Sequence, residues 1–338
     1  MKTTLRRGLI AVGGLATLGY LAPMAYLAVN EQRMVFRPDQ FGGRAVMPIP
    51  DSLHLVSNRV TFTSEDGAKI VGLVIPSADS ATQWLLYLHG NAGNVTSSVL
   101  PQFYARWHAL GLSILAIDYR GYGESEDRLP SEQGAYADAR AAYDWLRKAQ
   151  AVPANRIVIY GHSLGAGVAT ELALHVDAAG LIVEGAFTSV PDIGATVYPW
   201  FPVRLIASQR FANIDKIGLV AMPKLIMHAS DDHIVPYAHG QALYAAARAP
   251  KEWVELKGGH MRAPCFAHRN PDAPSKRALT PLVLPSYLQR HGHTRRQTIG
   301  TRAAHGIAYG AARPESAAHR HRQCHSGQLF RWWPLPES

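Results

Sequence analysis

Short apolar runs alternate with stretches of helical spacing along most of the chain. Near the start of this pattern, apolar runs over 54–63 and 69–75 flank Ser64-Glu65-Asp66-Gly67, which predicts a β-hairpin. Strands separated by helices predict an α/β domain with a mostly parallel sheet covered by helices on both faces. The predicted strands are 84–88, 112–117, 156–160, 181–183, 224–228 and 253–256, and the predicted helices are 97–110, 131–150, 164–175 and 240–248.

The N-terminal segment, 1–30, is predicted to be a transmembrane anchor. Its 22 residues from Gly8 to Val29 carry no charge, and about 20 apolar residues suffice for a helix to cross a bilayer. A cleaved signal peptide is the alternative, but Tyr26 and Pro23 occupy positions where a cleavage site needs small residues. Basic residues before the run (Lys2, Arg6, Arg7) predict a cytoplasmic N-terminus and place the domain that follows on the exported, extracytoplasmic side. The basic residues Arg33, Arg37 and Arg44 after it weaken this orientation.

Two stretches depart from the alternation of strands and helices. One is an insertion over 186–221, which carries five aromatic residues: Phe187, Tyr198, Trp200, Phe201 and Phe211. These aromatics fit either a short cap over an apolar pocket or a cover for the sheet edge. The other is the stretch 263–338, where periodicity ends. The folded domain is therefore predicted to cover 31–262.

The C-terminal stretch carries the basicity of the chain. Residues 263–338 hold 11 Lys and Arg against 3 Asp and Glu, a balance of +8 out of the total of +9. The predicted domain is nearly neutral, so no nucleic-acid partner is expected. We predict that this irregular, aberrant tail is disordered. It fits either a basic segment that binds an acidic partner or a lipid surface, or an out-of-frame translation, and we favour the second. Both cysteines, Cys265 and Cys324, lie there, which leaves the predicted domain without a disulfide or a cysteine-based metal site.

The main candidate for chemistry is Gly161-His162-Ser163-Leu164-Gly165, between a predicted strand and a predicted helix. A tight strand-to-helix turn projects the serine hydroxyl and requires small residues on both sides of it. The N–H groups at the start of the helix favour developing negative charge. We therefore predict that Ser163 is a catalytic nucleophile, the alternative being a glycine-rich turn with an incidental serine.

A serine nucleophile of this type needs an acid and a histidine later in the chain, at the ends of later strands. The predicted acid is Asp232, three residues before Val235 and just after a predicted strand, with Asp231 as a turn cap beside it. Glu184, after the preceding strand, is the alternative acid. The predicted base is His260, because the two glycines before it allow the loop to place the imidazole over the sheet.

An oxyanion hole needs two backbone N–H groups that point at the same oxygen. Leu164, directly after the nucleophile, is predicted to supply one of them. The loop after the 84–88 strand is predicted to supply the other, through Asn91 or else Ala92. The same loop is a poor phosphate site, because no Lys-Ser/Thr pair follows it.

These motifs together resemble the α/β-hydrolase superfamily, and within it a membrane-anchored branch related to serine aminopeptidases and depalmitoylating hydrolases. The matching strings are Leu88–Asn94, Asp118–Ser125, Gly161–Gly165, Glu184–Ser189 and Gly258–His260. The resemblance implies a serine hydrolase that cleaves esters or thioesters through an acyl-enzyme, without metal or organic cofactor, on a small-molecule or lipid-like acyl substrate. It leaves a peptidase and a non-catalytic member open, the latter because no terminal helix follows His260.

Overall fold

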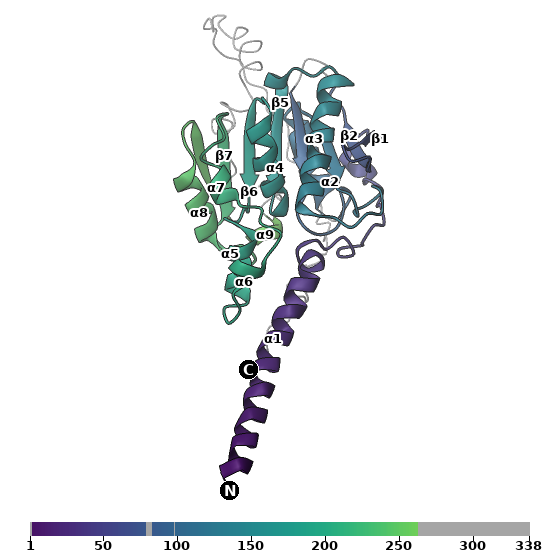
Figure 1. Ribbon diagram of the computed structural model, residues 1–338. Coiled ribbons are helices and arrows are strands. Elements are labelled where there is room, and N and C mark those ends of the chain that lie inside the picture. Colours follow the sequence, from purple (N-terminus) through teal and green to yellow (C-terminus); the bar gives the residue numbers. More distant parts are fainter. Residues whose placement is uncertain (1, 79–82, 98, 263–338) are drawn as a thin grey trace, which may run out of the picture. The chain divides into compact units, whose positions relative to one another are not determined.

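The computed structural model of the protein describes residues 2–78, 83–97 and 99–262 (Figure 1). The predicted tail, 263–338, lies outside the described residues. The elements are β1 (Asn58–Thr63), β2 (Lys69–Ile75), β3 (Trp84–Leu88), β4 (Ser113–Asp118), β5 (Ile157–His162), β6 (Gly180–Glu184), β7 (Lys224–Ala229), β8 (Lys251–Leu256), α1 (Lys2–Val35), α2 (Leu100–Ala109), α3 (Glu132–Lys148), α4 (Leu164–His175), α5 (Val190–Val197), α6 (Val203–Ile206), α7 (Asn213–Lys216), α8 (Tyr237–Ala246) and α9 (Gly259–Arg262).

The described strands form one eight-stranded sheet in the order β1-β2-β4-β3-β5-β6-β7-β8. β1 and β2 form an antiparallel hairpin, and β2 pairs antiparallel with β4. The pairs from β4 onward are parallel, since a helix joins each strand to the next. The predicted α/β fold with a mostly parallel sheet is confirmed. The parallel strands end at one common edge, where the candidate site lies.

Side chains of the central strands alternate between two hydrophobic cores, one on each face of the sheet. In β3, Leu86 and Leu88 belong to one core, while Leu85 and Tyr87 belong to the other. Helices α3 and α4 contribute buried residues to the first core and α2 contributes to the second. Successive side chains of β3 point to opposite faces of the sheet, and both faces are buried. The sequence of β3 is therefore a continuous apolar run.

Most element boundaries differ from the predicted ones by a few residues, and three of these differences have a visible form in the backbone. The N-terminal helix continues to Val35, five residues beyond the predicted anchor. β1 begins at Asn58 and not at 54, because His54 has a left-handed backbone (φ 49°) that ends a short 3-10 turn. α8 begins at Tyr237, three residues earlier than predicted, because Pro236 stands at its N-cap with an extended ψ of 136°.

The insertion after β6 contains the short helices α5, α6 and α7. Ser189 caps α5 by accepting a hydrogen bond from the Asp192 N–H at 3.1 Å. Its aromatic residues have two different environments: Phe187 and Phe211 are buried in the core, whereas Trp200 is 84% exposed. Part of the insertion therefore covers the sheet, and part of it does not pack on the domain.

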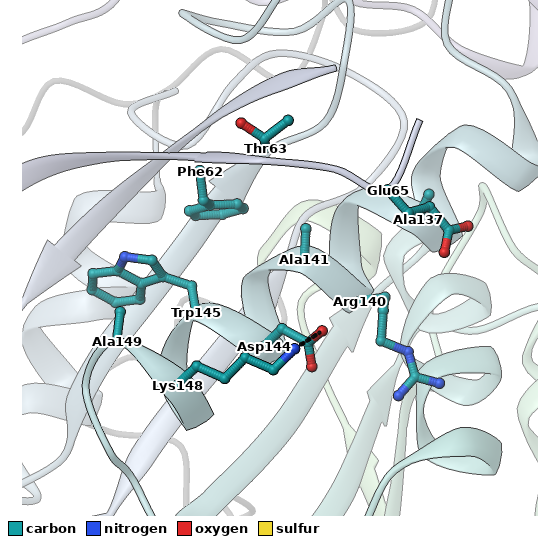
Figure 2. A pocket seen from close by; sticks show the side chains of 10 residues that line it. All are labelled: Phe62, Thr63, Glu65, Ala137, Arg140, Ala141, Asp144, Trp145, Lys148 and Ala149. Carbon is teal, nitrogen blue, oxygen red and sulfur yellow. Dashed lines mark hydrogen bonds and ion pairs between the residues drawn. The ribbon is translucent and has the colours of Figure 1, made fainter. Parts of the chain in front are cut away.

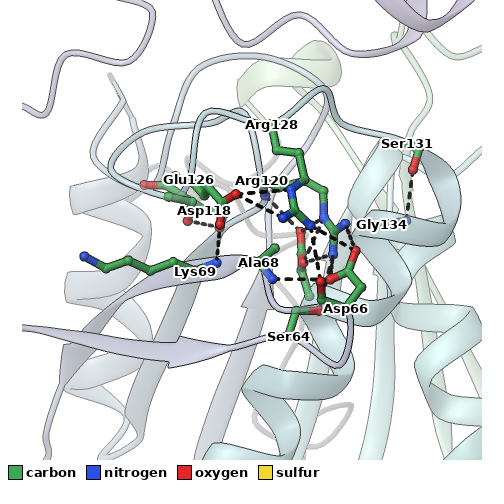
Figure 3. Close-up of polar contacts among 12 residues, drawn as sticks. Ser64, Asp66, Ala68, Lys69, Asp118, Arg120, Glu126, Arg128, Ser131 and Gly134 are labelled. Atoms are coloured by element: carbon green, nitrogen blue, oxygen red, sulfur yellow. Dashed lines mark hydrogen bonds and ion pairs between the residues drawn. The ribbon is translucent and has the colours of Figure 1, made fainter.

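The loop that follows β4 joins the β1–β2 turn to α3 (Figure 3). The Arg120 guanidinium pairs with Asp138 of α3 at 2.7 Å and with Asp66 of the turn. Ser125 Oγ donates to the Asp118 carbonyl at 2.6 Å and accepts the Val71 N–H at 2.8 Å. The buried Arg120–Asp138 ion pair is costly to break, because removing one partner leaves an uncompensated charge. These contacts give the loop a structural role.

Candidate active site

Ser163 lies in the turn between β5 and α4, with backbone angles of φ 54° and ψ −118°. A left-handed conformation costs a residue with a side chain about 1–3 kcal/mol, and such strain is concentrated at functional sites. The Ser163 N–H donates to the Glu184 carbonyl of the neighbouring strand β6 at 2.9 Å. This bond fixes the turn against the sheet.

The two glycines of the motif are required by close backbone contacts. A Cβ on Gly161 would lie 2.3 Å from the Gly165 carbonyl oxygen. A Cβ on Gly165 would lie 2.0 Å from the carbonyl oxygen of Leu88 at the end of β3. Backbone atoms cannot give way as a flexible side chain can. The turn is therefore compatible only with glycine at both positions, as the motif predicts.

The structure brings the predicted nucleophile, base and acid together at the carboxyl edge of the sheet. His260 Nε2 lies 2.8 Å from Ser163 Oγ, and His260 Nδ1 lies 2.7 Å from Asp232 Oδ2. All three residues are buried. The histidine is supplied by α9, the serine by the β5–α4 turn and the acid by the loop after β7. These distances fit the roles predicted for the three residues: a nucleophile, a base within hydrogen-bond reach and a group that orients the base.

Asp232 is held as a carboxylate by several donors. Its Oδ1 accepts the N–H groups of Ile234 at 2.8 Å and Val235 at 2.9 Å. Burial by itself raises the pKa of Asp232, but hydrogen bonds from His228 and His260 outweigh it and hold that pKa below its usual range. A carboxylate at this place can orient the imidazole and stabilise its protonated form.

Glu184, the alternative acid, has a different environment. The Tyr160 hydroxyl donates to its carboxyl group, and no hydrogen bond joins it to His260 in the described structure. Complete burial, together with the charge of Asp232, raises the pKa of Glu184 to about 8. A carboxyl group that is protonated at neutral pH cannot stabilise an imidazolium. The geometry therefore favours Asp232 over Glu184.

The raised pKa of Glu184 predicts a pH-dependent term in stability. The folded state keeps the proton up to about pH 8, whereas the unfolded chain releases it near the ordinary value of 4.5. The contribution is fully present below pH 4.5 and is lost as the pH rises towards 8. In Glu184→Gln this term is absent. Urea unfolding in detergent at pH 5, 6.5 and 8 should show the wild type losing stability relative to the variant by roughly 1 kcal/mol per pH unit. An unchanged difference would contradict a buried neutral Glu184.

Asp231 has a role that its sequence position did not reveal. Its carboxylate accepts the N–H groups of Gly258, at 3.0 and 3.1 Å, and of Gly259, at 3.0 Å. Both glycines have a left-handed backbone, with φ of 113° and 71°. The loop that carries His260 is therefore held from the β7 side, by the residue next to the predicted acid. The only sequence signal is the Asp-Asp pair itself.

The His162 ring also contacts the loop that carries His260. His162 Nε2 lies 3.2 Å from the His260 carbonyl oxygen, and the two ring centroids are 5.0 Å apart. Burial, reinforced by the neighbouring His260, lowers the pKa of His162 to about 3. A neutral His162 with its proton on Nε2 donates to that carbonyl. A variable position of the Gly-x-Ser-x-Gly string is thus occupied by a residue that contacts the predicted base.

Removing the Asp231 carboxylate should loosen the His260 loop without touching the reacting atoms. We expect Asp231→Ala to lower kcat about 10- to 100-fold with little change in KM, since small displacements of a positioned group are costly. Asp231→Asn keeps an oxygen for the Gly258 and Gly259 N–H groups and should recover most of the loss. Steady-state kinetics on a soluble ester separates kcat from KM. Equal losses in both variants would assign the effect to charge and not to positioning.

The loop predicted to complete an oxyanion hole lies against Ser163. A Cβ on Gly90 would be 3.4 Å from Ser163 Cβ. His89 Nδ1 lies 2.7 Å from the Gly90 carbonyl oxygen, and this contact orients the peptide whose N–H belongs to Asn91. The Asn91 carbonyl accepts the Arg37 N–H and the Tyr122 hydroxyl, both at 2.8 Å. Leu164 opens α4, so its N–H has no acceptor within the helix.

A surface pocket elsewhere on the domain is not part of this site. It lies between β1 and α3, and Figure 2 shows that its lining includes the aromatic side chains of Phe62 and Trp145 and the charged side chains of Arg140 and Lys148. None of the residues described above lines it. Within 2–78, 83–97 and 99–262 no group of three or more His, Cys, Asp or Glu side chains is arranged to hold a metal ion. That the chemistry needs no cofactor remains a prediction.

Comparisons with known proteins identify the family. The sequence profile described as "Alpha/beta hydrolase family" matches residues 85–222. An uncharacterised protein of Mycobacterium tuberculosis is 34% identical over 253 residues, which cover 74% of this chain and 86% of that one. The chain belongs to the alpha/beta hydrolase family. It is therefore a hydrolase, and the predicted resemblance is confirmed for the superfamily.

Other relatives and a solved structure agree with this membership. The lysophosphatidylserine lipase ABHD12 of Danio rerio is 36% identical over 193 residues, 52% of this chain and 50% of that protein. The alpha/beta hydrolase domain-containing protein 17B of Xenopus laevis is 34% identical over 59% of this chain and 67% of its own length. The Pyrococcus furiosus esterase Pf2001 superposes with a TM-score of 0.59 at 18% identity, over 71% of this chain and 98% of that one. This last likeness shows the fold alone.

Proposed function

We propose that the protein is a membrane-anchored serine hydrolase that cleaves carboxylic esters or thioesters through an acyl-enzyme. The proposal is carried by one observation: the His260 imidazole bridges Ser163 Oγ at 2.8 Å and Asp232 Oδ2 at 2.7 Å, while Ser163 has a left-handed backbone. A strained serine, a base in reach and an orienting carboxylate together support acyl transfer.

In the acylation step His260 Nε2 takes the proton of the Ser163 hydroxyl as Oγ attacks the acyl carbonyl carbon. Asp232 holds Nδ1–H and stabilises the imidazolium that forms. The N–H groups of Leu164 and Asn91, or Ala92 in its place, bind the oxyanion of the tetrahedral intermediate. As the intermediate collapses, His260 returns its proton to the leaving alcohol or thiol, and the acyl group stays on Ser163.

Deacylation uses the same groups with water as the nucleophile. His260 takes a proton from the water as its oxygen attacks the acyl carbonyl carbon. The second tetrahedral intermediate releases the carboxylic acid, and the proton returns to Ser163 Oγ. Since the imidazole must be unprotonated to act as a base, activity should fall in acid.

The relatives support an acyl or lipid substrate. One of them is named a lysophosphatidylserine lipase, and this name describes ester cleavage. The N-terminal helix supports a substrate at a bilayer. Its stretch Ile10–Val35 is long and apolar enough to cross a membrane, and few of its side chains are buried. We propose that α1 is an uncut anchor and that the domain lies on the exported side.

Covalent labelling tests this function. The full-length protein in detergent is treated with a fluorophosphonate, and the labelled peptide is identified by mass spectrometry. We expect the adduct on Ser163, blocked by prior heat denaturation. A panel of p-nitrophenyl esters, acyl thioesters and aminoacyl amides is then compared, with cleavage of the first two groups expected. No adduct, or an adduct at another serine, would defeat the proposal, and preferential amide cleavage would replace esterase by peptidase.

A further inference from the structure

The most exposed apolar side chains of the described residues occur in two places. They are Leu205 (85% exposed) and Trp200 (84%) in the insertion, and Val29 (83%) in α1. We define the tip of the insertion as residues 198–206, which run from the end of α5 through α6 (Figure 1). Its sequence, Tyr-Pro-Trp-Phe-Pro-Val-Arg-Leu-Ile, contains one charged residue. An exposed apolar cluster of this kind usually marks an interaction site.

The tip contacts the candidate membrane-spanning helix. The Tyr20 and Phe201 rings lie with centroids 5.4 Å apart, and the Tyr20 hydroxyl donates to the Trp200 carbonyl at 3.1 Å. Just after the tip, the Glu31 carboxylate accepts the Ser208 N–H at 2.8 Å and the Gln209 N–H at 2.9 Å. Tyr20 and Glu31 are 11 residues apart, which is about 16 Å along a helix. The insertion therefore follows α1 over a length that includes part of the apolar stretch Ile10–Val35.

The backbone of the tip is suited to an apolar medium. In lipid, a polar backbone group needs an internal partner, because no water is there to replace it. Two of the nine residues in the tip are prolines, which have no N–H. Five others donate their N–H to carbonyls of the same insertion: Tyr198, Phe201, Val203, Leu205 and Ile206.

The single charge of the tip is also neutralised. Arg204 Nε lies 2.9 Å from Asp192 Oδ1, in an ion pair within the insertion. Asp192 accepts a further hydrogen bond from the Thr188 hydroxyl at 2.7 Å. A paired arginine can stay at the membrane interface with its charge directed to the headgroups.

From these observations we infer that the tip enters the bilayer that α1 spans, with Trp200 and Leu205 in the lipid of one leaflet. The inference rests on the proposed anchor and on the proposed hydrolase function. The tip begins 13 residues after Gly185, where an added Cβ would lie 3.1 Å from the His260 ring. The first part of the insertion, 186–197, thus connects the candidate site to the tip. The substrate class that fits is an amphiphilic acyl ester or thioester of that leaflet.

Site-specific fluorescence on the full-length protein tests where the tip lies. Cys265 and Cys324 are first replaced by serine, and an environment-sensitive nitrobenzoxadiazole dye is then attached at Leu205→Cys. Leu15→Cys in α1 (70% exposed) reports the anchor, and Val56→Cys before β1 (71% exposed) is the control for an apolar position in water. The proteins are reconstituted in phosphatidylcholine–phosphatidylglycerol vesicles. We expect lipid-attached bromine to quench positions 15 and 205, and aqueous iodide to quench position 56.

Three other quenching results would contradict the inference. Lipid quenching at 15 with iodide quenching at 205 would overturn the inference and leave the anchor intact. Iodide quenching at position 15 would overturn both the inference and the proposed membrane anchor. A dye at 205 that neither quencher reaches, with energy transfer between labelled copies, would replace the lipid by a second copy of the chain.

Activity provides the second arm of the test. Trp200→Ser/Leu205→Ser should lower hydrolysis of a vesicle-embedded ester about tenfold, because each serine removes the burial of a large apolar side chain. Hydrolysis of soluble p-nitrophenyl acetate should stay unchanged. Both activities should also stay unchanged in Leu129→Ser, a control at an exposed leucine (61%) outside the tip. Equal loss on both substrates would overturn the inference. Inactivity of the wild type on both substrates would defeat the proposed function and leave the fluorescence result to decide the position of the tip.

Discussion

Ser163→Ala is expected to lower kcat for ester hydrolysis about 10⁶-fold, the largest effect of any single change in this protein. The expectation follows from the geometry, because no other hydroxyl group is hydrogen-bonded to His260 among the described residues. Removal of the nucleophile in serine hydrolases leaves only the contribution of oxyanion binding and substrate binding. Burst and steady-state kinetics with a p-nitrophenyl ester measure the loss.

The alanine variant should fold as the wild type does. Ser163 Oγ contacts His260 and the side chain adds little to the core, so the free energy of unfolding in urea should change by less than that of a typical mutation, about 1 kcal/mol. Ser52→Ala, an exposed serine before β1, serves as the matched control and should keep full activity. Residual turnover near the wild-type rate in Ser163→Ala would assign the chemistry to another residue.

Asp232→Asn is expected to lower kcat about 10⁴-fold, the second largest effect. The two Asp232 oxygens are used differently: Oδ1 accepts the Ile234 and Val235 N–H groups, and Oδ2 faces His260 Nδ1. An asparagine that keeps its oxygen on the backbone donors presents its NH₂ group to Nδ1. His260 then carries its proton on Nε2, where it cannot accept the proton of Ser163.

Kinetics over a range of pH distinguishes this effect from simple misfolding. A wrong tautomer lowers kcat and leaves KM and the far-ultraviolet circular dichroism unchanged, and hydroxide at high pH should recover part of the rate. Asp215→Asn, an exposed acid on α7, is the matched control. If Asp232→Asn stays active and Glu184→Gln is inactive, the acid has been assigned to the wrong residue.

Most elements of the sheet could be predicted from local pattern. Each parallel strand is buried on both faces and is followed by a helix, so apolar runs and helical spacing occur in strict alternation. The boundaries at His54, Val35 and Tyr237 could not be predicted, since a left-handed residue, a continued helix and a capping proline are local backbone events without an apolar signal. The fold class was therefore predictable, although several boundaries of the helices and strands were not.

The candidate site was predictable to the extent that its residues follow strands. Ser163, Asp232 and His260 come at the ends of β5, β7 and β8, and parallel strands bring their carboxyl ends to one edge. The sequence could not exclude Glu184, which also follows a strand, because the burial that raises its pKa is a property of the folded chain. The roles of Asp231 and His162 were missed, because both depend on contacts with a loop about 28 and 98 residues away.

By itself, the sequence determined the alternation of strands and helices, the glycine-flanked serine between β5 and α4, and the apolar N-terminal run. These are properties of neighbouring residues. Only the tertiary structure decided which carboxylate faces His260, what holds its loop, and which part of the insertion lies beside α1. Each of these depends on the distance between residues far apart in the chain, and folding sets that distance.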